Sequence, residues 1–490
     1  MTMCRLLMVL MFLLCASRLV SAQDQGPDPS TRAERQRLEA QGVSAFNRGD
    51  LEGAERAFRA WHELRPSDWI PLYNLATVVS GLGRTDEAAE LLGQSVSKGF
   101  VDFRLLERDG AMRRLAESAV YRDLMANWRA RQDEAIGRRI EQARRGFAKT
   151  YRFDRDEEQR LAFASGFSES SFGRVREEIT RLSRFFAEQV LPEGEVVVQA
   201  KGEKPEPWVM VVLPTPADYT AWAKRNYGVG WQQVGGVYDQ DRRELVAKDL
   251  GPTFRHEFFH VLHWRHINRL PRGQPAWVME GLCSLVEDVR VNADGTLTPR
   301  PSWRTNTVKR LVESGNPPSL RAMLGMSDAA FTGARPLANY ALARALFLFL
   351  YERGKLRAWY GDYTSEIKDD QTGRNALERA FNKPLGEIEK ELLEWVRGLP
   401  MVPDAERPPA VALPLSVGVS TGDGLRVNSV LRSAGAIRTG DVVTAVAGQS
   451  VADGNDLARI LGELAVGDEV EVEFRRGTRE QKAKLKVVAR

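Results

Sequence analysis

The sequence predicts a multidomain α+β protein, in which helical hairpins, a mixed helix-and-strand region and a small β-rich region follow one another. Three observations carry this prediction. The chain has 490 residues, more than one ordinary domain holds. A repeat with a 34-residue offset lies near its start. Short strand patterns with Gly-rich turns follow a Pro-rich linker at about residues 400–410.

Residues 1–22 have the pattern of a cleaved secretory signal. Arg5 precedes an apolar run at residues 6–16, and Val20-Ser21-Ala22 ends the segment. An apolar run of this length is too short to span a bilayer as a helix. We therefore expect an exported protein, periplasmic or secreted, with no transmembrane segment in the mature chain.

Charge and cysteine content narrow the partners of the mature chain. Removal of Arg5 and Arg18 lowers the net charge from +4 to +2, and no concentrated basic tract follows, so nucleic acid is not an expected partner. Cys283 is the only cysteine left after residue 22, which excludes an internal disulfide.

Residues 31–127 contain the repeat. Small or apolar residues recur at the same places in both copies, as Gly42 and Ala76, Gly49 and Gly83, Ala54 and Ala88, and Phe58 and Leu92. The pattern resembles tetratricopeptide repeats, which implies paired helices and a concave surface for a protein partner. A helical spacer without a ligand is the alternative.

The stretch TFRHEFFHVLHWRH contains His256, Glu257 and His260 in the pattern H-E-x-x-H. Residues four apart share one face of a helix, so both histidines can reach one ion. Glu257 would point about a quarter turn away, toward a metal-bound water, and act as its general base.

The third ligand has two candidates. His266 would require the helix to end at residue 263, but that residue is a histidine and no helix breaker follows it. Glu280 would lie on a second helix that begins after the break at residues 271–275. We favour Glu280, with His263 and His266 as flanking residues that could line the cleft.

Glu280 stands twenty residues after His260, in the pattern W-x-x-E-G. This arrangement resembles the gluzincin metalloproteases and, more closely, the peptidase MA-like domains of bacterial exported proteins. The resemblance implies a zincin-like α+β domain over residues 128–400. It also implies that His256, His260 and Glu280 bind one Zn²⁺, with Glu257 as the general acid/base.

The same resemblance implies a cleft-edge strand that holds an extended peptide. Its positions here are Gly235, Gly236, Val237 and Tyr238. Tyr340, 60 residues after Glu280, is the implied stabiliser of the transition state, with Tyr238 as the weaker candidate and core packing of Tyr340 as the alternative.

Two departures from the family pattern matter. Many gluzincins have an acidic residue four positions after the glutamate ligand, where this chain has Ser284. Glu287 could take that role, but we expect a solvated helix residue. The segment VGGVYD lacks the N-terminus-binding motif of the aminopeptidases, which favours an endopeptidase.

Residues 411–490 resemble a PDZ domain of the bacterial protease type, on the segments GLRVNSV, IRTGDVVTAVAGQSV and VGDEVEVEFRRG. The resemblance implies that a loop receives a peptide C-terminus through backbone N–H groups. Its residues are Ser416, Val417, Gly418 and Val419. A degenerate module that only packs on its neighbour is the alternative.

The sequence thus predicts an exported zinc endopeptidase that hydrolyses peptide bonds by Glu257-assisted attack of zinc-bound water. The repeats and the PDZ region would bind the protein substrate or a partner. The rival hypothesis is a catalytically silent scaffold that acts as an adaptor in the cell envelope. Retention of Glu257 argues against it, because a silent domain has no chemical need for that residue. An enzyme that cleaves cell-wall cross-links would use identical chemistry.

Overall fold

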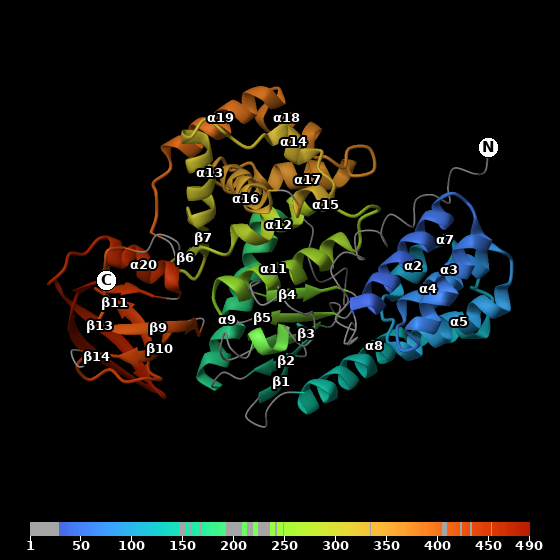
Figure 1. Ribbon diagram of the computed structural model, residues 1–490, viewed down its shortest axis with the longest axis horizontal. Coiled ribbons are helices and arrows are strands. Elements are labelled where there is room, and N and C mark those ends of the chain that lie inside the picture. The colour runs from blue at the N-terminus through green and yellow to red at the C-terminus, as the bar shows by residue number, and fades with distance from the viewer. Residues whose placement is uncertain are drawn as a thin grey trace.

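The computed structural model describes residues 29–146, 152–156, 159–165, 169–192, 208–212, 219–223, 236–240, 243–247, 249–333, 335–403, 409–421, 424–431, 434–451 and 453–490. The predicted signal, residues 1–22, and Gly235 lie outside these ranges. Within them, every helix is too short or too polar to cross a membrane. Figure 1 shows the N-terminal helices at one end of the molecule and the C-terminal β-rich region at the other.

The N-terminal helices pack each against the next around a core that includes Phe58, Trp61 and Tyr73. Gly42 permits this packing, because a Cβ at that position would collide with the Phe58 ring. The repeat glycine therefore has a steric role, although the tetratricopeptide assignment stays a prediction. The helices are α2 (Pro29–Asn47), α3 (Leu51–Leu64), α4 (Ile70–Gly81), α5 (Thr85–Lys98), α6 (Phe103–Arg108), α7 (Gly110–Arg113) and α8 (Ala119–Gly146).

A five-stranded sheet in the order β1-β2-β3-β5-β4 forms the centre of the molecule. Strands β2, β3 and β5 are parallel, whereas β1 and β4 pair antiparallel at the two edges. Arg243, just before β5, joins the sheet to the N-terminal helices through an ion pair with Asp102 at 3.3 Å. The strands are β1 (Arg152–Asp156), β2 (Leu161–Ser165), β3 (Trp208–Val212), β4 (Gly236–Asp239) and β5 (Glu244–Ala247).

Helices after and beside this sheet form the largest hydrophobic core, which also includes residues of β2, β3 and β5. Helix α16 is buried along most of its length, because PLANYALARALFLFLYE is apolar on nearly every face. The helices are α9 (Glu169–Phe185), the π-helix η2 (Phe186–Val190), α11 (Pro252–Ile267), α12 (Ala276–Leu285), α13 (Trp303–Glu313), α14 (Leu320–Leu324), α15 (Asp328–Phe331), α16 (Pro336–Glu352), α17 (Leu356–Glu366), α18 (Arg374–Phe381) and α19 (Leu385–Gly398). A hairpin of β6 (Val289–Val291) and β7 (Leu297–Pro299) follows α12.

The C-terminal region has its own core, formed by a sheet in the order β14-β13-β11-β10-β9 and one helix. Ser416 to Val419, predicted as a loop, belong to the edge strand β9, in which Ser416 and Val417 pair with β10. Local sequence could not show this, because pairing with a partner strand decides it. The elements are β8 (Val411–Ala412), β9 (Leu415–Ser420), β10 (Leu425–Val430), β11 (Val442–Val446), β12 (Gln449–Ser450), α20 (Gly454–Gly462), β13 (Glu469–Arg476), β14 (Arg479–Lys486) and β15 (Val488–Ala489).

Candidate metal centre

Helix α11 carries the H-E-x-x-H pattern and begins beside the sheet. Asp249 caps it, since its carboxylate accepts hydrogen bonds from the N–H of Gly251 at 2.9 Å and the hydroxyl of Thr253 at 2.9 Å. Pro252 occupies the first turn, where its missing N–H costs nothing. The helix then continues without a break to Ile267, so the chain does not turn back at residue 263.

Three side chains from two helices converge on one point. Nε2 of His256 lies 3.1 Å from Nε2 of His260 and 3.2 Å from Oε2 of Glu280. His260 Nε2 lies 3.7 Å from the same carboxylate oxygen. Each of the three residues offers one ligand atom within 4.8 Å of the others, a grouping that could hold a metal ion. Two imidazoles and one carboxylate are a donor set suited to Zn²⁺.

Gly281 lets Glu280 approach the histidines from the second helix. A Cβ at Gly281 would collide with the ring of Phe347 on α16, so only glycine allows α12 to pack this closely against α16. Pro275 is the N-cap residue of α12 and has an extended conformation, after the non-helical segment that separates α12 from α11. The W-x-x-E-G pattern therefore combines a candidate ligand position with a helix-packing position.

The carboxylates around this group favour a positive charge on the His256 imidazole. Burial disfavours a charged imidazole at His256, but the hydrogen bonds and charges of Glu280 and Glu287 raise its pKa to about 10. Burial would raise the pKa of Glu280, yet the charge of His260 and its contact with His256 bring it below the usual range. Burial also raises the pKa of Glu257, as a general base requires.

Glu287 corrects an expectation from the sequence, because it is neither solvated nor on a helix. Helix α12 ends at Leu285, and the turn that follows buries Glu287 with Oε1 2.8 Å from Nδ1 of His256. Arg304 donates two hydrogen bonds of 2.8 Å to the same carboxylate. Ser284 instead donates to the carbonyl of Gly281 at 2.9 Å. The expectation was wrong because it continued the helical pattern past Leu285.

His263 and His266 do not line the cleft but lie buried around one tyrosine. The Tyr360 hydroxyl lies 3.1 Å from Nε2 of His263 and 2.9 Å from Nδ1 of His266. The Gln274 amide donates to the same hydroxyl at 3.3 Å. His266 therefore contacts Tyr360, which lies 94 residues further along the chain, and it is not one of the three converging donors.

The edge strand β4 contacts the helix that carries the motif. A Cβ at Gly236 would lie 2.6 Å from Cγ and 2.8 Å from Oε1 of Glu257, so the backbone of β4 runs against the candidate base. Tyr238 stacks on the His260 ring at 5.0 Å and on Trp208 at 5.1 Å. Val237 is buried as well, so the side chains of both Val237 and Tyr238 are used in packing.

Tyr340 lies on α16 in the field of the same carboxylates. Burial raises the pKa of its hydroxyl, and the negative charge of Glu280 raises it further. Its ring packs 4.9 Å from Phe331 and lies below the guanidinium of Arg304, 5.5 Å away. Tyr340 thus remains a protonated donor near Glu280, while the core packing that was its alternative role also holds its ring in place.

The comparisons with known proteins identify one region. Residues 415–487 match the model of the PDZ domain family, so the C-terminal region is a PDZ domain. Among solved structures, an aminopeptidase N family protein from Idiomarina loihiensis is similar at 14% identity and a TM-score of 0.27, over 69% of this chain and 67% of that one. The search of curated proteins found no match.

Proposed function

We propose that this chain is an exported zinc-dependent peptidase of the gluzincin type, with an endopeptidase specificity. The observation that supports this most is the convergence of His256, His260 and Glu280 beside Glu257. A bound Zn²⁺ would lower the pKa of a coordinated water and polarise the scissile carbonyl. Removal of residues 1–22 on export belongs to the same proposal, and the N-terminal sequence of the secreted protein tests it.

The chain's own residues perform the proton transfers and the positioning. Glu257 accepts a proton as the oxygen of water bonds to the carbonyl carbon, and delivers it to the amine nitrogen when the C–N bond breaks. Tyr340 donates a hydrogen bond to the oxyanion that develops on the carbonyl. Gly236 and its neighbours in β4 hold the peptide in an extended conformation by main-chain hydrogen bonds.

The two ends of the chain would select the substrate. The PDZ domain offers β9 at the edge of its sheet, where a peptide can add as a further strand. The N-terminal helices would supply a second protein-binding surface. Protein or peptide is therefore the proposed substrate class.

The decisive test compares residues 23–490 with the Glu257→Gln variant, using zinc content and cleavage of a fluorescently labelled unfolded protein. We expect one zinc per chain in both proteins and cleavage in the wild type alone. A wild type that binds no zinc would overturn the proposal in favour of the scaffold. Zinc without protein cleavage, but with release of cross-linked cell-wall peptides, would favour the alternative enzyme.

A second pair of variants tests the ligand set. Glu280→Ala should lose the zinc, because two histidines alone make a weak site. His266→Ala should keep it, because His266 contacts Tyr360. If His266→Ala lost the zinc and Glu280→Ala kept it, the third ligand would be His266 and not Glu280.

A further inference from the structure

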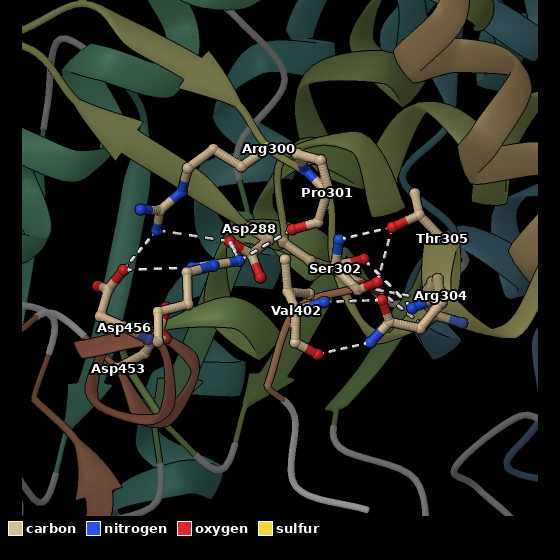
Figure 2. A network of polar contacts seen from close by, with 12 residues as sticks. Asp288, Arg300, Pro301, Ser302, Arg304, Thr305, Val402, Asp453 and Asp456 are labelled. Atoms are coloured by element: carbon tan, nitrogen blue, oxygen red, sulfur yellow. Dashed lines mark hydrogen bonds and ion pairs between the residues drawn. The ribbon is translucent and has the colours of Figure 1, made fainter. Parts of the chain in front are cut away.

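The PDZ domain contacts residues 128–400, the proposed peptidase region, through charged residues in and just before α20. Asp456 faces Arg300, which also lies toward Asp288 (Figure 2). Asp453 pairs with Arg255, and Arg459 pairs with Asp288. Asp453 is 3% exposed and Arg255 is 2% exposed, so water screens the pair between them very little. The contacts are Arg255 with Asp453 at 2.7 Å, Arg459 with Asp288 at 2.6 Å, Arg459 with the carbonyl of Pro301 at 2.9 Å, and Arg300 with Asp456.

One of these contacts leads directly to the candidate metal ligands. Arg255 precedes His256 on α11 and donates through the same nitrogen to Asp453 and to the carbonyl of Glu287, each at 2.7 Å. Its Nε donates to the carbonyl of Val286 at 3.0 Å. Arg255 therefore ties the turn that carries Glu287 to the PDZ domain, and the Glu287 carboxylate in turn contacts His256.

We propose that Asp453 of the PDZ domain is a positioning residue of the metal centre, acting on His256 through Arg255 and Glu287. This inference rests on the proposed function, because it assumes that His256 binds the metal. The PDZ domain is then also part of the structure that orients a ligand, in addition to the peptide binding proposed for its edge strand β9.

Loss of the Asp453 carboxylate should disturb the site, because the buried guanidinium of Arg255 would lose its nearest negative charge. Arg255 is 2% exposed, and its remaining carboxylate partner, Glu178, lies 3.4 Å away at its other terminal nitrogen. Without the Asp453 carboxylate, the guanidinium must shift toward Glu178 or toward water. Either shift moves the hydrogen bond that holds the Glu287 backbone, and with it the carboxylate beside His256.

The test compares the full mature chain with Asp453→Asn and Asp456→Asn. Both variants remove one negative charge from the same interface, but Asp453 hydrogen-bonds to Arg255 whereas Asp456 pairs with Arg300. Zinc affinity is measured by competition with a chromophoric chelator, and the melting temperature monitors folding. We expect Asp453→Asn to bind zinc about tenfold more weakly than Asp456→Asn, the lower end of the effect of outer-shell partners. Equal affinities in the two variants would overturn the inference.

A measurement on the wild type keeps the inference testable if Asp453→Asn does not fold. Coupling is reciprocal, so zinc must tighten PDZ docking as much as docking tightens zinc binding. Amide hydrogen exchange with and without Zn²⁺ should show slower exchange in residues 453–462 as well as in α11. Protection of α11 alone would overturn the inference and leave the proposed function standing, whereas a wild type that binds no zinc would overturn both.

Discussion

Glu287 Oε1 lies 2.8 Å from Nδ1 of His256, while the other nitrogen of the same imidazole lies 3.2 Å from Glu280. Arg304 holds the Glu287 carboxylate with two hydrogen bonds. A carboxylate in this place favours the tautomer that carries its proton on Nδ1, and so leaves Nε2 free as a donor atom toward a metal. Under the proposed function, Glu287 would take the orienting role that the gluzincin pattern places four residues after the glutamate ligand.

Glu287→Gln should weaken zinc binding by about 10- to 100-fold, because an amide orients the imidazole less strongly than a carboxylate does. Chelator competition measures the change. Ser284→Ala is the matched control, since its hydroxyl contacts only the Gly281 carbonyl among the described hydrogen bonds and its loss should leave zinc affinity unchanged. If Ser284→Ala weakened zinc binding more than Glu287→Gln did, Ser284 and not Glu287 would be the residue that orients His256.

Gly236→Ala should lower the rate of peptide hydrolysis about a hundredfold with zinc still bound. The new methyl group would lie 2.6 Å from Cγ of Glu257 and must displace that side chain, and a displacement of about 1 Å costs a rate factor of this order. Steady-state kinetics and zinc content measure the two effects. Gly386→Ala on α19 is the control, because nothing lies within 4 Å of its added Cβ. Unchanged kinetics in Gly236→Ala would mean that Glu257 does not act from this position.

Tyr340→Phe should reduce kcat by about 10²- to 10³-fold and leave KM and the melting temperature nearly unchanged. The hydroxyl would act on the developing oxyanion, whereas the ring, which packs on Phe331, is kept. Tyr351→Phe is the control, because it removes a hydroxyl from the same helix. The Tyr351 ring packs against Phe185, and we expect this variant to keep the wild-type kcat. A fall in melting temperature with normal kcat in Tyr340→Phe would assign Tyr340 to core packing alone.

Acid should destabilise the region around Tyr360 through His263. Burial, followed by the charge of His266, lowers the pKa of His263 from 6.5 to about 3. As the pH falls below 6.5, the unfolded chain takes up a proton that the folded chain refuses. The contribution to stability is therefore complete above 6.5 and declines toward pH 3, by at most about 1.4 kcal/mol per pH unit.

The melting temperature between pH 7.5 and 5.0, measured with EDTA in all samples, checks this expectation. His263→Gln has no titrating ring and should lose less melting temperature over that interval than the wild type. Parallel losses in the two proteins would show that His263 is not the group that acid charges.

Local geometry explains what the sequence alone could determine. The spacing of His256 and His260 places both on one face of any helix, and the absence of a breaker at residue 263 correctly predicted that α11 continues past His266. The resemblance of GLRVNSV, IRTGDVVTAVAGQSV and VGDEVEVEFRRG to segments of PDZ domains was enough to predict the PDZ domain. The metal itself, the reaction and export remain predictions from this pattern.

Only the tertiary structure decided which distant residues complete the site. Glu287 reaches His256 because α12 ends two residues earlier, His266 meets Tyr360 from 94 residues away, and Arg255 meets Asp453 across 198 residues. No periodicity relates such positions, since their contact depends on how helices and domains pack against one another. The sequence was enough to predict the three candidate ligands, which lie on one helix and on the helix that follows it. Packing determined which charged side chains lie around them, because those side chains come from distant parts of the chain.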